Sequence, residues 1–78
     1  MEETREIWQI AQEIKSDWKR ISPYAEPYLQ AMFSLITIND SYGWDSGDTI
    51  VRYFLANAGS WRGETARRIK KELNDMLK

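Results

Sequence analysis

Apolar residues recur at the spacing of an α-helix near both ends of this chain. The steps between them are four, three, four and three residues at the start, and three, four and three near the end. Both patterns place apolar side chains on one face of an amphipathic helix. The first stripe consists of Ile7, Ala11, Ile14, Trp18 and Ile21, and the last consists of Ala66, Ile69, Leu73 and Met76.

Two further helices are expected between these stripes. Proline lacks an amide donor and suits the first turn of a helix, so Pro23 and Pro27 mark the approach to a second helix. Either Ser22 caps this helix with Pro23 in its first turn, or the chain turns first and Pro27 takes that position. The loop-like segment 39–47, rich in glycine and polar residues, then separates it from a third helix with its own apolar stripe.

Together these patterns predict an all-α fold, a small bundle of four helices over residues 4–21, 24–38, 47–58 and 61–77. A chain of 78 residues has the length of a single domain. It contains no cysteine and no histidine, so disulfides and sites built on thiolate or imidazole ligands cannot hold the fold together. No segment shows a convincing strand pattern.

The same composition argues against an enzyme. Histidine and cysteine supply the commonest general base and the usual nucleophilic triads. The carboxylates of Asp40, Asp45 and Asp48 lie close in sequence, but their spacing does not fit an EF-hand loop. Capping of the third helix explains two of them without a metal ion. We therefore expect a non-enzymatic protein with no catalytic residues, no cofactor and no metal site.

The chain shows no signal for export or membrane insertion. Its first ten residues carry three acidic side chains and lack the apolar core of a signal peptide. The longest mostly apolar run, residues 31–38, is too short to span a bilayer. We therefore expect a cytoplasmic protein without a membrane partner, and leave its oligomeric state open.

The net charge of −1 is unevenly distributed. Residues 1–51 carry four bases and nine acids, a net charge of −5, whereas residues 52–78 carry seven bases and three acids, a net charge of +4. The basic end offers a candidate nucleic-acid patch. This patch consists of Arg62, Arg67, Arg68, Lys70 and Lys71. Pairs four residues apart, Arg68 with Glu72 and Lys71 with Asp75, are expected to neutralise much of it.

Residues 41–63, SYGWDSGDTIVRYFLANAGSWRG, concentrate aromatic side chains. Trp18 and Trp61 are expected in the core, but Trp44, in the loop before the third helix, has no such explanation beyond pinning that loop. Tryptophan, tyrosine and arginine dominate interface hot spots. If the third and fourth helices form a tight hairpin, the loop and the WRG sequence make one protein-binding patch. Its expected members are Tyr42, Trp44, Asp45, Asp48, Arg52, Tyr53, Trp61 and Arg62.

The sequence also resembles a group of small proteins. The runs SPYAEPYLQAM and INDSYGWDSGDTIVRYFLANAGSWRGETARRIKKELNDML, within about residues 20–77, are similar to functionally uncharacterised proteins of phages and prophages of low-GC Gram-positive bacteria. The resemblance implies a phage context, a host-cell cytoplasmic location and no catalytic residues. By analogy, phage proteins of this size are commonly accessory proteins that bind host or phage machinery, counter-defence inhibitors included.

Three functions follow as hypotheses. The first is a phage or prophage accessory protein that binds another protein through the aromatic patch. The alternative is a small DNA-binding regulator that uses the basic helix 61–77. The third is a structural or assembly protein that oligomerises through the first helix, where Trp8 and Ile10 flank the main stripe.

Overall fold

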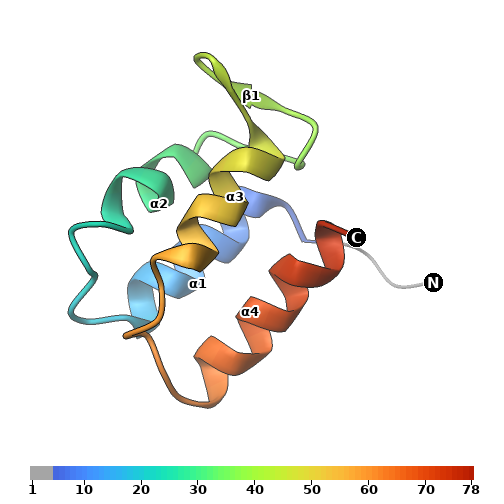
Figure 1. Cartoon of the computed structure of the whole chain (residues 1–78). Coiled ribbons are helices and arrows are strands. Elements are labelled where there is room, and N and C mark those ends of the chain that lie inside the picture. Colours follow the sequence, from blue (N-terminus) through green and yellow to red (C-terminus); the bar gives the residue numbers. More distant parts are fainter. Residues whose placement is uncertain (1–4) are drawn as a thin grey trace.

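The computed structural model describes residues 5–78, and this part of the chain contains four α-helices and one short β-hairpin (Figure 1). The helices are α1 (Ile7–Asp17), α2 (Glu26–Met32), α3 (Gly47–Ala56) and α4 (Glu64–Met76). The hairpin consists of β1 (Ser41–Tyr42) and β2 (Asp45–Ser46), which pair antiparallel. The mostly helical class is confirmed, whereas the hairpin departs from the expected purely helical bundle.

All four helices are shorter than the sequence predicted. α1 ends at Asp17 instead of residue 21, because Trp18 takes an extended backbone with φ −87° and ψ 97°. α2 begins at Glu26 with Pro27 in its first turn, which is the later of the two predicted starts. α3 ends two residues early, and α4 begins at Glu64 because the backbone of Gly63 is not helical.

α2 ends at Met32, six residues before the predicted end. The chain then turns across the start of α1, where the amides of Ile7 and Trp8 donate to the carbonyls of Ile36 and Leu35, both at 3.0 Å. The first amides of any helix lack partners within the helix. The carbonyls of Leu35 and Ile36 accept hydrogen bonds from these unpaired amides of α1. Helical periodicity cannot reveal this contact, because it joins segments that are distant in sequence.

One hydrophobic core joins the four helices, and α1 packs against α2 on one side and α4 on the other (Figure 1). An aromatic cluster lies at one end of this core. The indole rings of Trp18 and Trp61 stack with centroids 5.7 Å apart, and Phe54 meets both rings edge-on. Trp61 also donates its indole N–H to the Asp17 carboxylate at 2.8 Å. The predicted burial of Trp18 and Trp61 is confirmed.

Ile10 is completely buried in the same core. The hypothesis that Ile10 contributes to an oligomerisation surface on the first helix is therefore wrong. Trp8 is partly exposed, and its indole N–H donates to the Glu6 carboxylate. None of the helices in residues 5–78 has the length and apolar character needed to cross a membrane.

The start of α3 lies directly against the turn that follows α2. A Cβ atom on Gly47 would come within 2.9 Å of the carbonyl oxygens of Thr37 and Ile38. Real Cβ atoms essentially never approach backbone this closely, so a larger residue requires the two segments to separate. Glycine at this position therefore permits the close contact that fixes α3 on the turn.

We expect Gly47→Ala to lower the free energy of unfolding by about 1–3 kcal/mol, the usual cost of forcing extra volume into a packed site. The change can be measured by urea unfolding followed by tryptophan fluorescence. Gly59→Ala is the matched control, because a Cβ at Gly59 meets nothing within 4 Å. Equal stability of the two variants would contradict the proposed close contact.

Candidate functional site

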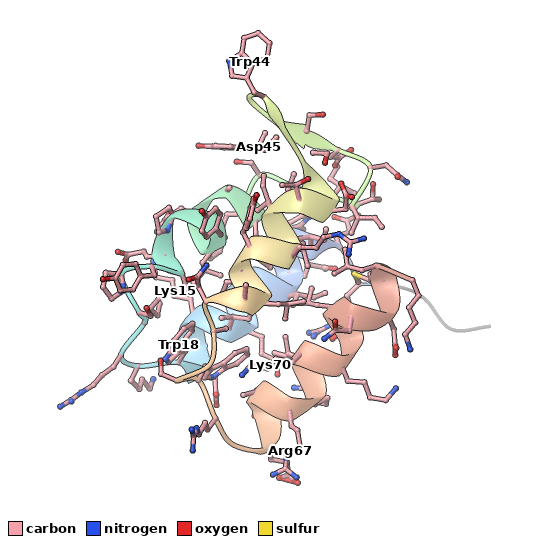
Figure 2. The ribbon with its side chains drawn as sticks, in the orientation of Figure 1. Lys15, Trp18, Trp44, Asp45, Arg67 and Lys70 are labelled. Carbon is pink, nitrogen blue, oxygen red and sulfur yellow. The ribbon has the colours of Figure 1, made fainter. Side chains whose placement is uncertain are left out.

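The β-hairpin presents Trp44 at its tip. Ser41 pairs with Ser46 and Tyr42 with Asp45, which leaves Gly43 and Trp44 as a two-residue turn. Gly43 has φ +62° whereas Trp44 has a negative φ, the pattern of a type II′ turn with glycine at its first central position. The turn directs the indole away from the body of the protein, and Trp44 is fully exposed, at 101% (Figure 2).

Backbone contacts hold the base of this hairpin on the core. The Asp40 carboxylate accepts the amides of Ile36 and Thr37, at 2.7 and 3.2 Å. The amide of Gly47 donates to the Asp40 carbonyl at 2.6 Å, and that of Asp48 donates to the Ile38 carbonyl at 3.0 Å. The hairpin therefore projects from a fixed base. Asp40 has a structural role in the turn.

The first two turns of α3 extend the exposed surface. Asp48 lies 3.9 Å from the guanidinium of Arg52, one turn along the helix. The hydroxyl of Ser46 donates to the Asp48 carboxylate and holds the pKa of Asp48 below its ordinary value. Tyr53 is half exposed, and its ring lies 5.4 Å from that of Tyr28 on α2. Tyr28 could not be assigned to this surface from the sequence, because only the packing of α2 on α3 brings it there.

Six of the eight residues predicted for the protein-binding patch occupy the hairpin and the start of α3. We call this set the hairpin surface, and it consists of Tyr42, Trp44, Asp45, Asp48, Arg52 and Tyr53. The other two do not join it. Trp61 is only 2% exposed and belongs to the core, while Arg62 follows the far end of α3. The ten residues of α3 separate the two places by about 15 Å.

The residues of the predicted nucleic-acid patch have different surroundings. Arg68 pairs with Glu13 on α1, and Lys71 pairs with Asp75 at 3.1 Å. The Lys70 ammonium donates to two backbone carbonyls of the α3–α4 connection, those of Ala58 and Trp61, at 2.8 and 2.7 Å. Burial lowers the pKa of Lys70, with a further contribution from the charge of Arg62. Within residues 5–78, Arg62 and Arg67 form no ion pair, which leaves two cations of the five for an outside anion.

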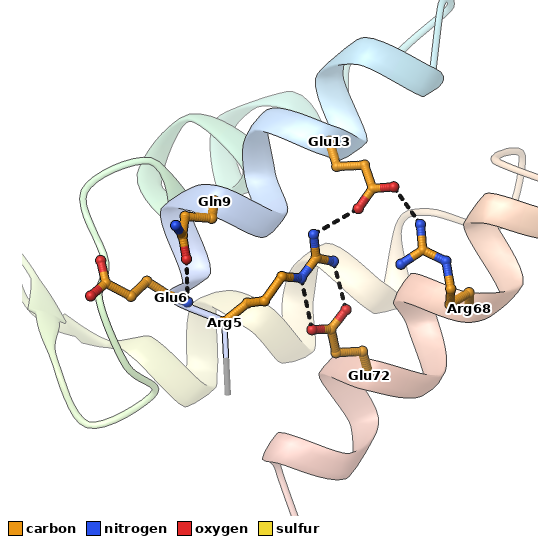
Figure 3. Close-up of polar contacts among 6 residues, drawn as sticks. All are labelled: Arg5, Glu6, Gln9, Glu13, Arg68 and Glu72. Atoms are coloured by element: carbon orange, nitrogen blue, oxygen red, sulfur yellow. Dashed lines mark hydrogen bonds and ion pairs between the residues drawn. The ribbon is translucent and has the colours of Figure 1, made fainter. Parts of the chain in front are cut away.

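Arg68 belongs to an ion network that ties α1 to α4 (Figure 3). Arg5 donates to both carboxylate oxygens of Glu72, at 3.0 and 2.7 Å, and to Glu13 at 2.8 Å. The expected Arg68–Glu72 pair within α4 is therefore wrong, because both residues have partners outside the helix. The predicted Lys71–Asp75 pair is confirmed. The hydrogen bond from Arg5 is the largest cause that holds the pKa of Glu13 below 4.5, and burial opposes it.

A hollow beside this network has a volume of about 990 Å³. The start of α1, the turn 36–38 and the end of α4 enclose it. Its rim carries Arg5, Glu72 and Arg68, which already satisfy one another. In residues 5–78, no three carboxylates lie together in a way that could hold a metal ion.

Comparison with protein-family models, with curated proteins and with solved structures finds no match to this chain. The hairpin surface, with one large aromatic side chain held out into solvent, is its most distinctive exposed feature.

We expect Glu13→Gln to lower the free energy of unfolding at pH 7 by about 1 kcal/mol or less, since the ion pairs are partly exposed. A carboxylate whose pKa falls on folding stabilises the protein at pH values above the pKa it has in the unfolded state. That contribution disappears as the pH falls through the lower folded pKa. The difference in free energy of unfolding between wild type and variant should therefore shrink below about pH 4. Urea unfolding at pH 7 and pH 3 measures it.

Asp45→Asn removes the same charge from an exposed residue that has no hydrogen bond or ion pair to another described side chain, and provides the control. It should change stability little at either pH. If Glu13→Gln lowers the free energy of unfolding by the same amount at pH 7 and pH 3, the role given to the network is contradicted.

Proposed function

We propose that the chain is a non-enzymatic phage or prophage accessory protein that acts by binding another protein through the hairpin surface. The partner belongs to host or phage machinery, and a counter-defence role falls within this proposal. The observation that carries the proposal is the full exposure of Trp44 at the tip of a hairpin whose base is fixed on the core.

The exposure of Trp44 makes the hairpin the preferred surface. Tryptophan buries a large area when it enters a pocket and is among the residues most often found at the energetic centre of an interface. The three other tryptophans have partners within the protein, since Trp18 and Trp61 stack in the core and Trp8 bonds to Glu6. Trp44 is the one whose side chain has no role in the described structure.

The fixed base of the hairpin also favours binding. A side chain on a mobile loop loses conformational freedom when it binds, and this loss weakens the complex. The carboxylate of Asp40 and the amides of Gly47 and Asp48 hold the base, and the type II′ turn sets the direction of Trp44. Much of the ordering therefore takes place during folding, before the partner arrives.

The chemistry of the hairpin surface indicates what the partner must offer. Asp45 is exposed and has no side-chain partner in residues 5–78, while Asp48 shares its charge with Arg52. An apolar pocket for the indole, with a cation or backbone amides at its rim, would complement this arrangement. The phage context rests on the resemblance of residues 20–77 alone.

We expect Trp44→Ala to abolish capture of the partner from a lysate of a low-GC Gram-positive host, with Tyr42→Ala weakening it. The partner is identified by mass spectrometry, purified, and titrated against each variant by calorimetry. Loss of a central tryptophan anchor should weaken binding by about 2 kcal/mol or more, roughly thirtyfold. Wild-type affinity in both variants would remove the hairpin from the proposal.

Two controls separate binding from folding. Tyr24→Ala removes a largely exposed aromatic ring from the α1–α2 connection, away from the hairpin, and should leave partner binding intact (Figure 1). Trp44→Ala should change the stability by about 0.5 kcal/mol or less, because its side chain is exposed. Trp61→Ala should cost about 3–5 kcal/mol, because the same residue type is buried there.

A further inference from the structure

A second, smaller hollow lies at the opposite end of α3 from the hairpin. It is lined by residues of the α3–α4 connection and the first turns of α4, and its volume is about 360 Å³. Four of its lining residues are uncharged: Trp61, Ala66, Gly59 and Gly63. The other three are cations: Arg62, Arg67 and Lys70. We call this site the basic hollow.

We propose that the basic hollow of one molecule receives the hairpin tip of a second copy of this chain. The indole of Trp44 packs against the glycines and Ala66 of the lining, and the Asp45 carboxylate meets the guanidinium groups of Arg62 and Arg67. The hollow lies within the size range of sites that bind small organic groups, ~300–1,000 Å³. Arginine also stacks favourably on the face of an indole ring.

Charge complementarity supports this occupant. Residues 37–48 contain three aspartates and no basic residue, while the lining of the basic hollow contains three cations and no acid. Glu64 is near the hollow in sequence and Asp17 accepts the indole N–H of Trp61, but neither carboxylate lines the hollow, so its cationic character dominates. The two surfaces therefore attract each other, although the whole protein is close to neutral.

The groups at both surfaces are free to pair. Among residues 5–78, Arg62 and Arg67 form no ion pair, and Asp45 has none either. Lys70 already donates to the carbonyls of Ala58 and Trp61, so it contributes charge at the wall without needing to move. Docking then adds ion pairs without breaking any that the folded monomer makes.

The two surfaces cannot meet within one molecule. Trp44 and Arg67 lie at opposite ends of the structure (Figure 2). An interface between two different surfaces is heterologous, and unless a rotation closes it into a ring, it propagates as an open chain. The predicted assembly therefore grows with protein concentration and has no fixed size.

This inference uses the same tryptophan as the proposed function, so self-association and partner binding compete for the hairpin. The basic hollow distinguishes them. A variant with a blocked hollow loses self-association and still presents an intact hairpin to a protein partner. Each proposal can therefore fail while the other stands.

The first experiment is sedimentation velocity on the full chain over a wide concentration range at two salt concentrations. At about 10 mM salt, where charges act over ~30 Å, the average mass should rise with concentration above the monomer mass of 9.2 kDa. At about 1 M salt the Debye length is ~3 Å, and the association constant should fall by about tenfold or more. A constant mass of 9.2 kDa under all conditions would overturn the proposal.

The second experiment uses two blocked variants that complement each other. Trp44→Ala with Asp45→Lys blocks the hairpin, and Arg62→Glu with Arg67→Glu blocks the basic hollow. Each variant alone should remain monomeric. A mixture has one working hairpin and one working hollow, so it should form a dimer that cannot grow further. A mixture that stays monomeric, or a variant that still associates alone, would refute the assigned surfaces.

Lys71→Glu with Lys78→Glu makes the same change of charge in the second half of α4 and just beyond its end, and is the matched control. It should associate like the wild type. If this control is also monomeric, the association reflects net charge rather than the basic hollow. If the wild type stays monomeric yet binds duplex DNA with a steep salt dependence that Arg62→Glu with Arg67→Glu removes, the hollow is assigned to phosphate instead.

Discussion

The stacked indoles of Trp18 and Trp61 are the contact on which the rest of the structure depends. Trp18 ends α1 and Trp61 lies in the connection before α4, so their stacking joins two segments more than forty residues apart. Phe54 brings α3 to the same cluster, and Asp17 satisfies the one polar group that Trp61 buries. In a chain without disulfides, this cluster holds one end of the core together.

The ion network joins the same two helices along their length, where Arg5 and Glu13 meet Glu72 (Figure 3). α4 has a strongly polar outer face and buries only a narrow stripe, Ala66, Ile69 and Leu73. Its attachment therefore depends on the aromatic cluster near its start and the ion network along its length. These two anchors fix the position of the α3–α4 connection, and with it the geometry of the basic hollow.

The first and last helices could be predicted because each carries a local apolar stripe, and the burial of Trp18 followed from its place in the first stripe. Trp61 precedes the last stripe, and it is buried because it stacks on Trp18. The helix ends could not be predicted. α2 stops at Met32 because the carbonyls of Leu35 and Ile36 serve the start of α1, and this contact joins residues that are distant in sequence. The hairpin was missed because its strands have two residues each, too few to show an alternating pattern.

The sequence left two roles for Trp44, pinning its loop or forming part of a recognition surface, and its full exposure rules out the first. The distance between Trp44 and Arg62 could not be predicted, because the expected patch required a tight turn between the last two helices. α3 instead separates two surfaces of opposite charge, one acidic with a projecting indole and one basic and hollow. The residues that form these surfaces contribute little to the core, apart from Trp61 and Ala66, so the chemistry of the others can change without loss of the fold. For this reason their complementarity points to binding, since stability does not require it.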